Sequence, residues 1–216
     1  LAELKPDVRV DVWLDASGKG RDLRAPDEAA SPAWTKVAGT PVMRFDGVDD
    51  CLRLIGQKTD LDSLTIFLVA IPHTNAGGFR GFMAFNAKDQ RDWQSGLTID
   101  QGPSPSTVFA ELNIEGKGFL GARSLLKKAI PFGAAQIFEV RSDRAERTIT
   151  LAVDGVPAGE RPRDAVPLSM DEITVGSRYY TNEPGPQIAR GFGQVDIAEV
   201  IVFSEPLNTN NLGTVL

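Results

Sequence analysis

Apolar and polar residues alternate with a period of two over much of this chain, which is typical of β-strands with one buried face. Apolar side chains take every second position between Val8 and Leu14, and again between Thr148 and Val153. The segment from Leu64 to Ile71 is instead apolar on both faces apart from one threonine. This pattern predicts a central strand that is covered on both sides. The chain is therefore expected to be almost entirely β.

Two Asp-Gly dipeptides join short runs of strand-like residues. The first lies within Val42–Leu54, at Asp46 and Gly47, and the second lies within 149–157, at Asp154 and Gly155. Asp-Gly tolerates the positive φ angles that tight hairpin turns require. Each segment is therefore predicted to be a β-hairpin.

Further strands are expected at 82–85, 97–99, 108–112, 137–140, 173–176 and 195–203. Helix is expected only as a turn or two at 122–128 and as a short terminal helix capped by Asn208. No repeat, linker or low-complexity tract divides the chain, so residues 1–216 are read as one domain. We expect a two-sheet antiparallel β-sandwich, with Val8–Leu14 lying close to Val195–Phe203.

Four segments support a more specific interpretation. In chain order they are F-D-G-V-D-D-C-L-R-L (45–54), V-D-G (153–155), T-V-G (174–176) and G-Q-V-D-I-A-E-V (193–200). This series resembles the laminin-G-like branch of the concanavalin A-like lectin/glucanase superfamily, from about Trp13 to Leu216. The resemblance implies the same jelly-roll sandwich. It leaves the activity open, because this fold serves lectins, hydrolases, lyases and adhesion modules.

By the same resemblance, such modules belong to large secreted or envelope-associated bacterial proteins. That implies an extracellular, periplasmic or cell-surface location, with other domains of a longer parent chain as partners. The start at Leu1, without methionine or a signal segment, favours the same interpretation.

Composition narrows the classes of partner. A net charge of −6 without a basic stripe argues against nucleic acid. The longest apolar run has eight residues, against roughly 20 for a membrane span. The single cysteine, Cys51, cannot form an internal disulfide. It is expected to be a packed or half-exposed thiol.

Two loops have the composition of a sugar-binding site. They span residues 86–96 and 177–187 and hold one of the three tryptophans and both tyrosines. Sugar sites combine aromatic faces, which stack on pyranose C–H bonds, with planar polar groups that pair with hydroxyls. The alternative is that these rings only cover the core. The candidate glycan-binding residues are Trp93, Tyr179, Tyr180, Arg178, Asn182, Asn86, Arg91 and Arg190.

The residues for catalysis are incomplete. Glucan hydrolases of the resembling superfamily carry E-x-D-x-x-E, whereas this chain has Gln194, Asp196 and Glu199 at those positions. Gln194 removes the first carboxylate, and a regular strand would place Asp196 and Glu199 on opposite faces. The single histidine, His73, has no nucleophile motif beside it. We therefore expect no enzymatic activity, with a polysaccharide hydrolase or lyase as the less favoured alternative.

One His and one Cys cannot form a zinc site, but carboxylates in loops are suited to calcium. The candidate ligands for a structural calcium are Asp15, Asp22 and Asp196, with Asp46, Asp49 and Asp50 as further candidates. For Asp196 and Glu199, a buried hydrogen-bonded network with an arginine such as Arg44, Arg53 or Arg190 is favoured over calcium. No cofactor is required by any motif.

These observations predict a non-catalytic, lectin-like module that holds a polysaccharide near the rest of a parent protein. Many weak contacts suffice for such a role, because tethering raises the effective concentration. The alternative is a protein–protein adhesion or scaffold domain without a glycan site.

Overall fold

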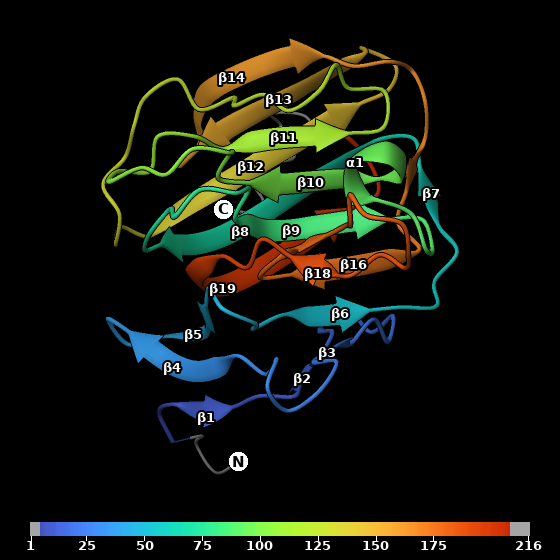
Figure 1. Ribbon diagram of the computed structural model, residues 1–216. Helices are drawn as coiled ribbons and strands as arrows, with labels where there is room; N and C mark the ends of the chain where they lie inside the picture. Colours follow the sequence, from blue (N-terminus) through green and yellow to red (C-terminus); the bar gives the residue numbers. More distant parts are fainter. Residues whose placement is uncertain (1–4, 208–216) are drawn as a thin grey trace.

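Two antiparallel β-sheets pack face to face in the computed structural model, which describes residues 5–207 (Figure 1). The eight-stranded sheet has the order β1 (Val8–Arg9), β4 (Ala33–Val37), β5 (Thr40–Asp46), β19 (Gln194–Phe203), β8 (Leu64–Pro72), β12 (Gln136–Asp143), β13 (Thr148–Val153), β14 (Val156–Pro162). The seven-stranded sheet has the order β11 (Asn113–Gly116), β10 (Leu97–Asp100), β9 (Gly81–Asn86), β16 (Glu172–Val175), β6 (Leu52–Leu54), β3 (Leu23–Arg24), β2 (Val12–Trp13). The predicted all-β sandwich is confirmed.

Little else is regular structure within the described residues. Two short pairs complete the set, β7 (Asp60–Leu61) with β15 (Leu168–Ser169) and β17 (Arg178–Tyr179) with β18 (Ala189–Arg190). The helix α1 (Asp92–Ser95) has four residues. No helix in this part of the chain is long and apolar enough to cross a membrane.

The core lies between the sheets and is rich in aromatic rings. Phe82 stacks on Phe109 with ring centroids 5.9 Å apart, and Phe138 packs against both. β8 lies between β19 and β12, as its two apolar faces predicted. On its outer face, Phe67 meets Phe203 edge to face at 6.2 Å.

The two Asp-Gly segments have different structures. Residues 149–157 form the predicted hairpin of β13 and β14, with positive φ at Asp154 and Gly155. Val42–Leu54 is not a hairpin, because β5 and β6 belong to different sheets. Hydrogen bonds from the backbone to carboxylate side chains stabilise this turn, where a hairpin would have bonds between two paired strands. The Asp50 carboxylate accepts the N–H of Asp46 at 2.9 Å, and Asp46 accepts the N–H of Val48 at 2.8 Å.

The predicted first strand is also divided between the sheets. β1 pairs with β4 in the larger sheet, whereas β2 pairs with β3 in the smaller one. Between them the chain crosses over, since the Val10 N–H bonds to Pro32 O and the Asp11 C=O accepts from Ala25. β4 and β5 separate β1 from β19, so the expected proximity of the first and last strands is wrong for β1.

Two local predictions fail elsewhere. Residues 108–112 make only an isolated bridge, Phe109 to Ile130, and the strand begins at Asn113. Residues 122–128 are not helical, since the Arg161 guanidinium binds the Gly121 carbonyl at 2.8 Å and Ser124 bridges Asn113. The terminal helix predicted at Asn208 lies outside the described residues.

Candidate functional site

The two sugar-site loops meet on the outer face of the seven-stranded sheet. α1, from the first loop, contacts β9, β10 and β11, and β17, from the second loop, contacts β9 (Figure 1). The rings of Trp93 and Tyr180 touch edge to face, with centroids 5.1 Å apart. Arg91 closes the contact by donating from Nε to the Thr181 carbonyl at 2.8 Å. Segments some 90 positions apart therefore form one surface.

A buried cluster of charges joins the loops beneath this surface. Arg178, which is 2% exposed, donates from Nε and Nη2 to both oxygens of Asp92, at 3.1 and 2.8 Å. Its Nη1 donates to Asp100 Oδ2 at 3.1 Å, and Glu115 lies 3.7 Å away. A buried arginine is tolerated when its donors are paired in this way. The three carboxylates come from α1, β10 and β11, so the arginine ties the second loop to all of them.

Asp92 also fixes the backbone of both loops. Its carboxylate accepts the N–H of Trp93 at 2.7 Å and the N–H of Tyr179 at 2.9 Å, besides the two bonds from Arg178. Trp93 is thereby placed directly over the cluster, and Arg178 Cζ lies 5.2 Å from its ring centroid and 4.9 Å from that of Tyr180. The sequence interpretation missed these carboxylates. They could have been expected on one ground: an arginine that is buried needs carboxylates close to it to balance its charge.

Burial raises the pKa of Asp100 to about 6, although the charge of Arg178 and the N–H of Gly102 lower it. The native state thus favours the protonated carboxyl, because the unfolded pKa lies near 4. This stabilising contribution is complete below about pH 4 and is lost as the pH rises through about 6.

This pH dependence gives a first prediction. The stability of the natural domain relative to Asp100→Asn should fall by up to about 3 kcal/mol between pH 4 and pH 6. Urea denaturation of both proteins at several pH values measures the difference and removes the contributions of groups that they share. If the difference in free energy of unfolding between the two proteins stays constant from pH 4 to pH 6, the pKa of Asp100 is not raised.

Three predicted glycan contacts lie below the surface. Asn86 is fully buried and donates to Glu172 Oε2 at 2.7 Å. Tyr179 is buried, with Arg53 Cζ 3.8 Å from its ring centroid. With Arg178, these side chains support the surface and do not present free groups to a ligand. The backbone of these two residues pairs with β18, Arg178 with Arg190 and Tyr179 with Ala189.

The other predicted residues remain accessible around the two rings. Trp93 and Tyr180 are half-buried, and Arg190 and Asn182 are exposed. Arg91 Cζ lies 5.4 Å from the Trp93 centroid, and Arg190 Cζ lies 5.9 Å from that of Tyr180. We name these five residues the aromatic platform. It combines two ring surfaces with two cationic groups and an amide.

The candidate calcium ligands do not assemble. The Asp15 carboxylate is turned to its own loop and accepts from the N–H of Arg21 and of Ser17, bonds that lower its pKa to about 2. Asp22 accepts the N–H of Asp15. Asp196 belongs to the other sheet, where Arg44 binds both its oxygens at 2.8 Å. These three residues therefore cannot hold one ion together.

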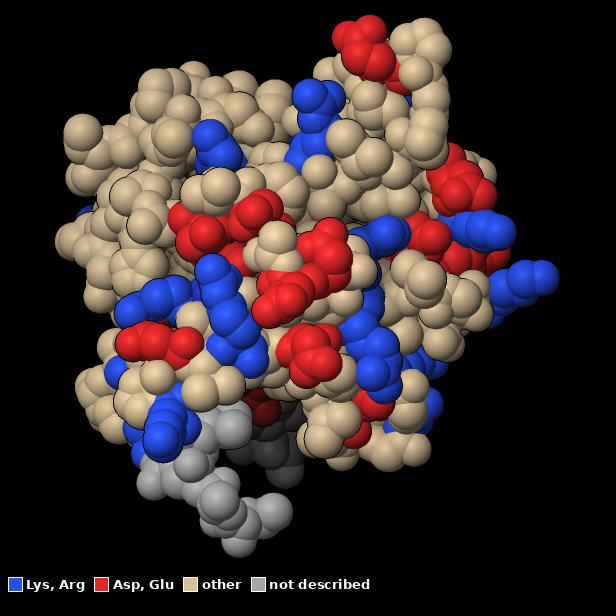
Figure 2. All heavy atoms as spheres, turned by 60° about the horizontal axis from the view of Figure 1, so that its bottom comes forward, with Lys and Arg blue, Asp and Glu red and all other residues tan. Residues whose placement is uncertain are grey.

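Among the described residues, Asp46, Asp49 and Asp50 bring carboxylate oxygens within 4.8 Å of one another. Two of these carboxylates already accept the backbone bonds that close the β5 corner, and Asp50 also pairs with Arg9 at 2.8 Å. Acidic and basic side chains are interspersed over the face at the bottom of Figure 1 (Figure 2). Calcium binding stays a prediction.

Asp196 and Glu199 share a face, contrary to the expectation from a regular strand. A β-bulge skips one residue, so that Asp196 pairs with Ile71 and Glu199 with Val69, which lie two apart on β8. His73 Nε2 is 2.9 Å from Asp196. Burial raises the pKa of Asp196, but the hydrogen bonds from Arg44 and His73 outweigh it and hold the pKa below its usual value.

Comparison with solved structures shows that other proteins share this two-sheet β-sandwich fold. A SAP-like pentraxin from Limulus polyphemus matches with a TM-score of 0.60 at 15% identity, over 80% of this chain and 79% of its own. Domain 4 of AbnA, an extracellular arabinanase from Geobacillus stearothermophilus solved with arabinotriose, matches with a TM-score of 0.58 at 14% identity, over 88% and 84%.

The receptor-binding domain of botulinum neurotoxin type G matches with a TM-score of 0.61 at 11% identity, over 97% of this chain and 49% of its own. This chain thus spans about half of that domain. No family model and no curated protein matches the sequence. At these identities, the likeness establishes the fold and leaves the laminin-G-like branch a prediction.

Proposed function

We propose that this domain is a non-catalytic carbohydrate-binding module that tethers a larger secreted protein to a polysaccharide. The observation that carries the proposal is the aromatic platform. Two loops far apart in the sequence converge to present the rings of Trp93 and Tyr180 between Arg91 and Arg190. In the buried cluster beneath it, Asp92 of the first loop accepts bonds from Arg178 and Tyr179 of the second, which holds the two loops together.

The platform offers the two kinds of contact that a sugar needs. A ring face stacks on the C–H bonds of a pyranose, and Arg91, Arg190 and Asn182 donate to hydroxyl or acidic groups around it. The salt-bridged support below fixes the rings before the ligand arrives, which reduces the ordering cost of binding.

The two arginines favour an acidic polysaccharide, since guanidinium pairs bidentately with carboxylate or sulfate. The net charge of −6 opposes such a ligand only at long range. Screening over about 8–10 Å leaves a local pair of cations effective.

The structural neighbours support a binding role at the level of the fold. The arabinanase domain was solved with arabinotriose, and the toxin domain is described as receptor-binding. By analogy, the module would work outside the cytoplasm as one part of a longer chain.

A glycan array tests the proposal. The chain should retain glycans that carry carboxylate or sulfate groups, and Arg91→Gln/Arg190→Gln should lose this preference. Arg147→Gln is the matched control, because Arg147 is 65% exposed and lies between β12 and β13 of the other sheet. Retention of no glycan, or equal retention by the double variant, would reject the proposal.

The absence of catalysis is a separate prediction. Gln194 stands where the glucan hydrolases have a carboxylate, and Asp196 is held ionised by Arg44. A carboxylate held in this way is a poor general acid. We expect no release of reducing ends from β-glucans or galactans. Turnover that disappears in Asp196→Asn or Glu199→Gln would contradict this.

A further inference from the structure

The last strand loses one of its neighbours halfway along its length. β19 pairs with β8 from Val195 to Phe203, but it pairs with β5 only from Gln194 to Ile197. The β-bulge after Ile197 falls where the pairing with β5 stops. Bulges bend a strand and end its pairing. Within the described residues, one edge of 198–203 therefore has no strand beside it.

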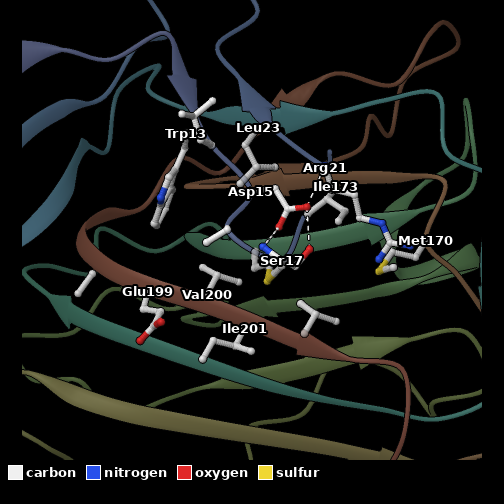
Figure 3. A pocket seen from close by; sticks show the side chains of 15 residues that line it. Trp13, Asp15, Ser17, Arg21, Leu23, Met170, Ile173, Glu199, Val200 and Ile201 are labelled. Atoms are coloured by element: carbon white, nitrogen blue, oxygen red, sulfur yellow. Dashed lines mark hydrogen bonds between the residues drawn. The ribbon is translucent and has the colours of Figure 1, made fainter. Parts of the chain in front are cut away.

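A cavity of about 450 Å³ follows this open edge (Figure 3). Five consecutive residues, Ala198–Val202, line it. Consecutive residues of a strand point to alternate faces, so a cavity lined by all five lies beside the strand and not on one face of it. The opposite wall belongs to the seven-stranded sheet and is apolar, with Trp13, Leu23, Met83 and Ile173.

The backbone of the open edge determines what fits there. Every second residue of a strand directs its N–H and C=O away from a given neighbour, and such groups need a partner when water is excluded. A second extended chain pairs with all of them, which is why open edges act as templates for strand addition. Side chains at alternate positions of that chain would enter the cavity, whose methionines Met83 and Met170 adapt to different shapes.

One end of the cavity carries a positive charge. The Arg21 side chain extends toward Met170, whereas Trp13 stands at the other end (Figure 3). Arg21 is half-buried and forms no ion pair in the part of the chain that the structure describes. The neighbouring Asp15 carboxylate accepts backbone N–H groups of its own loop. A carboxylate on the incoming chain would pair with this guanidinium.

We propose that residues 198–203 bind an extended peptide as an added strand. Its apolar side chains lie at alternate positions toward Trp13 and Met83, and a carboxylate lies at the Arg21 end. This site is separate from the aromatic platform, so the module holds a protein segment and a glycan at once.

The test uses the full chain and a fluorescein-labelled peptide, acetyl-Lys-Val-Thr-Val-Thr-Val-Glu-amide, followed by fluorescence anisotropy. Two N-methylated forms are compared, one methylated at the valines and one at the threonines. The N–H groups of the two sets point to opposite edges of an extended chain. Strand addition predicts that one form binds at least about tenfold more weakly, whereas the other retains its affinity.

Variants of the protein provide matched controls. Val200→Lys places a charge in the cavity and should abolish binding, whereas Val156→Lys, at an exposed position of β14 that does not line the cavity, should not. Arg21→Glu should lose the peptide that ends in Glu and bind one that ends in Lys. Thermal melting and glycan binding of each variant report whether the fold is intact.

Three outcomes would overturn the proposal. The first is that the unmethylated Glu-ending peptide does not bind the natural chain at 1 mM. The second is that the two methylation patterns weaken binding equally. The third is that decanoate displaces the peptide and still binds the Arg21→Glu variant. The last result would mean an apolar small-molecule cavity. None of them affects the glycan proposal, which depends on other residues.

Discussion

Replacing Arg178 by methionine should destabilise this domain by about 3–5 kcal/mol, the usual cost of removing one partner from a buried ion pair. The substitution leaves the carboxylates of Asp92 and Asp100, both 0% exposed, without their countercharge. The loss should shrink toward pH 4, because Asp100 then takes up a proton. Urea denaturation at pH 7 and pH 4 measures both effects.

Arg147→Met is the matched control for this prediction. Arg147 pairs with Asp164 at 3.7 Å, but the two side chains are 65% and 62% exposed. Its loss should cost less than about 1 kcal/mol. If Arg178→Met is no more costly than Arg147→Met, the cluster does not tie the two loops together.

The second large effect should appear in binding. Trp93→Ala should weaken glycan affinity tenfold or more, since a stacked aromatic ring contributes about 1–3 kcal/mol. The melting temperature should change less than in Arg178→Met, because Trp93 is half-buried and lies above the cluster. Isothermal titration calorimetry with a glycan retained on the array measures the affinity, and differential scanning calorimetry measures the melting temperature.

Trp93→Phe is the conservative partner of that variant. It keeps an aromatic face and should recover part of the affinity. A Trp93→Ala protein that melts several degrees lower but binds its glycan normally would show that Trp93 only covers the sheet.

Periodicity predicted the sandwich because alternation reports burial directly. It could not assign strands to sheets. Asp46-Gly47 and Asp154-Gly155 look alike in the sequence, yet the first turns the chain into the opposite sheet. The difference lies in long-range partners, since Asp50 binds Arg9 from 41 positions away. Likewise, the bulge after Ile197 reverses the relation of Asp196 to Glu199, and the sequence gives no sign of it.

For the site, composition indicated the two loops and their approximate role, because aromatic and planar polar side chains are concentrated there. It did not separate the accessible side chains from the buried ones. Arg178 and Arg190 face each other in the β17–β18 pair, but only Arg178 meets three carboxylates contributed by other elements. Such neutralisation depends on tertiary packing, which a loop composition does not encode.

The most direct measurement follows the three indole N–H resonances, from Trp13, Trp34 and Trp93, during a glycan titration by two-dimensional NMR. Tryptophan-to-phenylalanine variants assign them. The Trp93 resonance should shift in a saturable way while those of Trp13 and Trp34 stay in place. A saturating glycan that leaves the Trp93 resonance unmoved would contradict it.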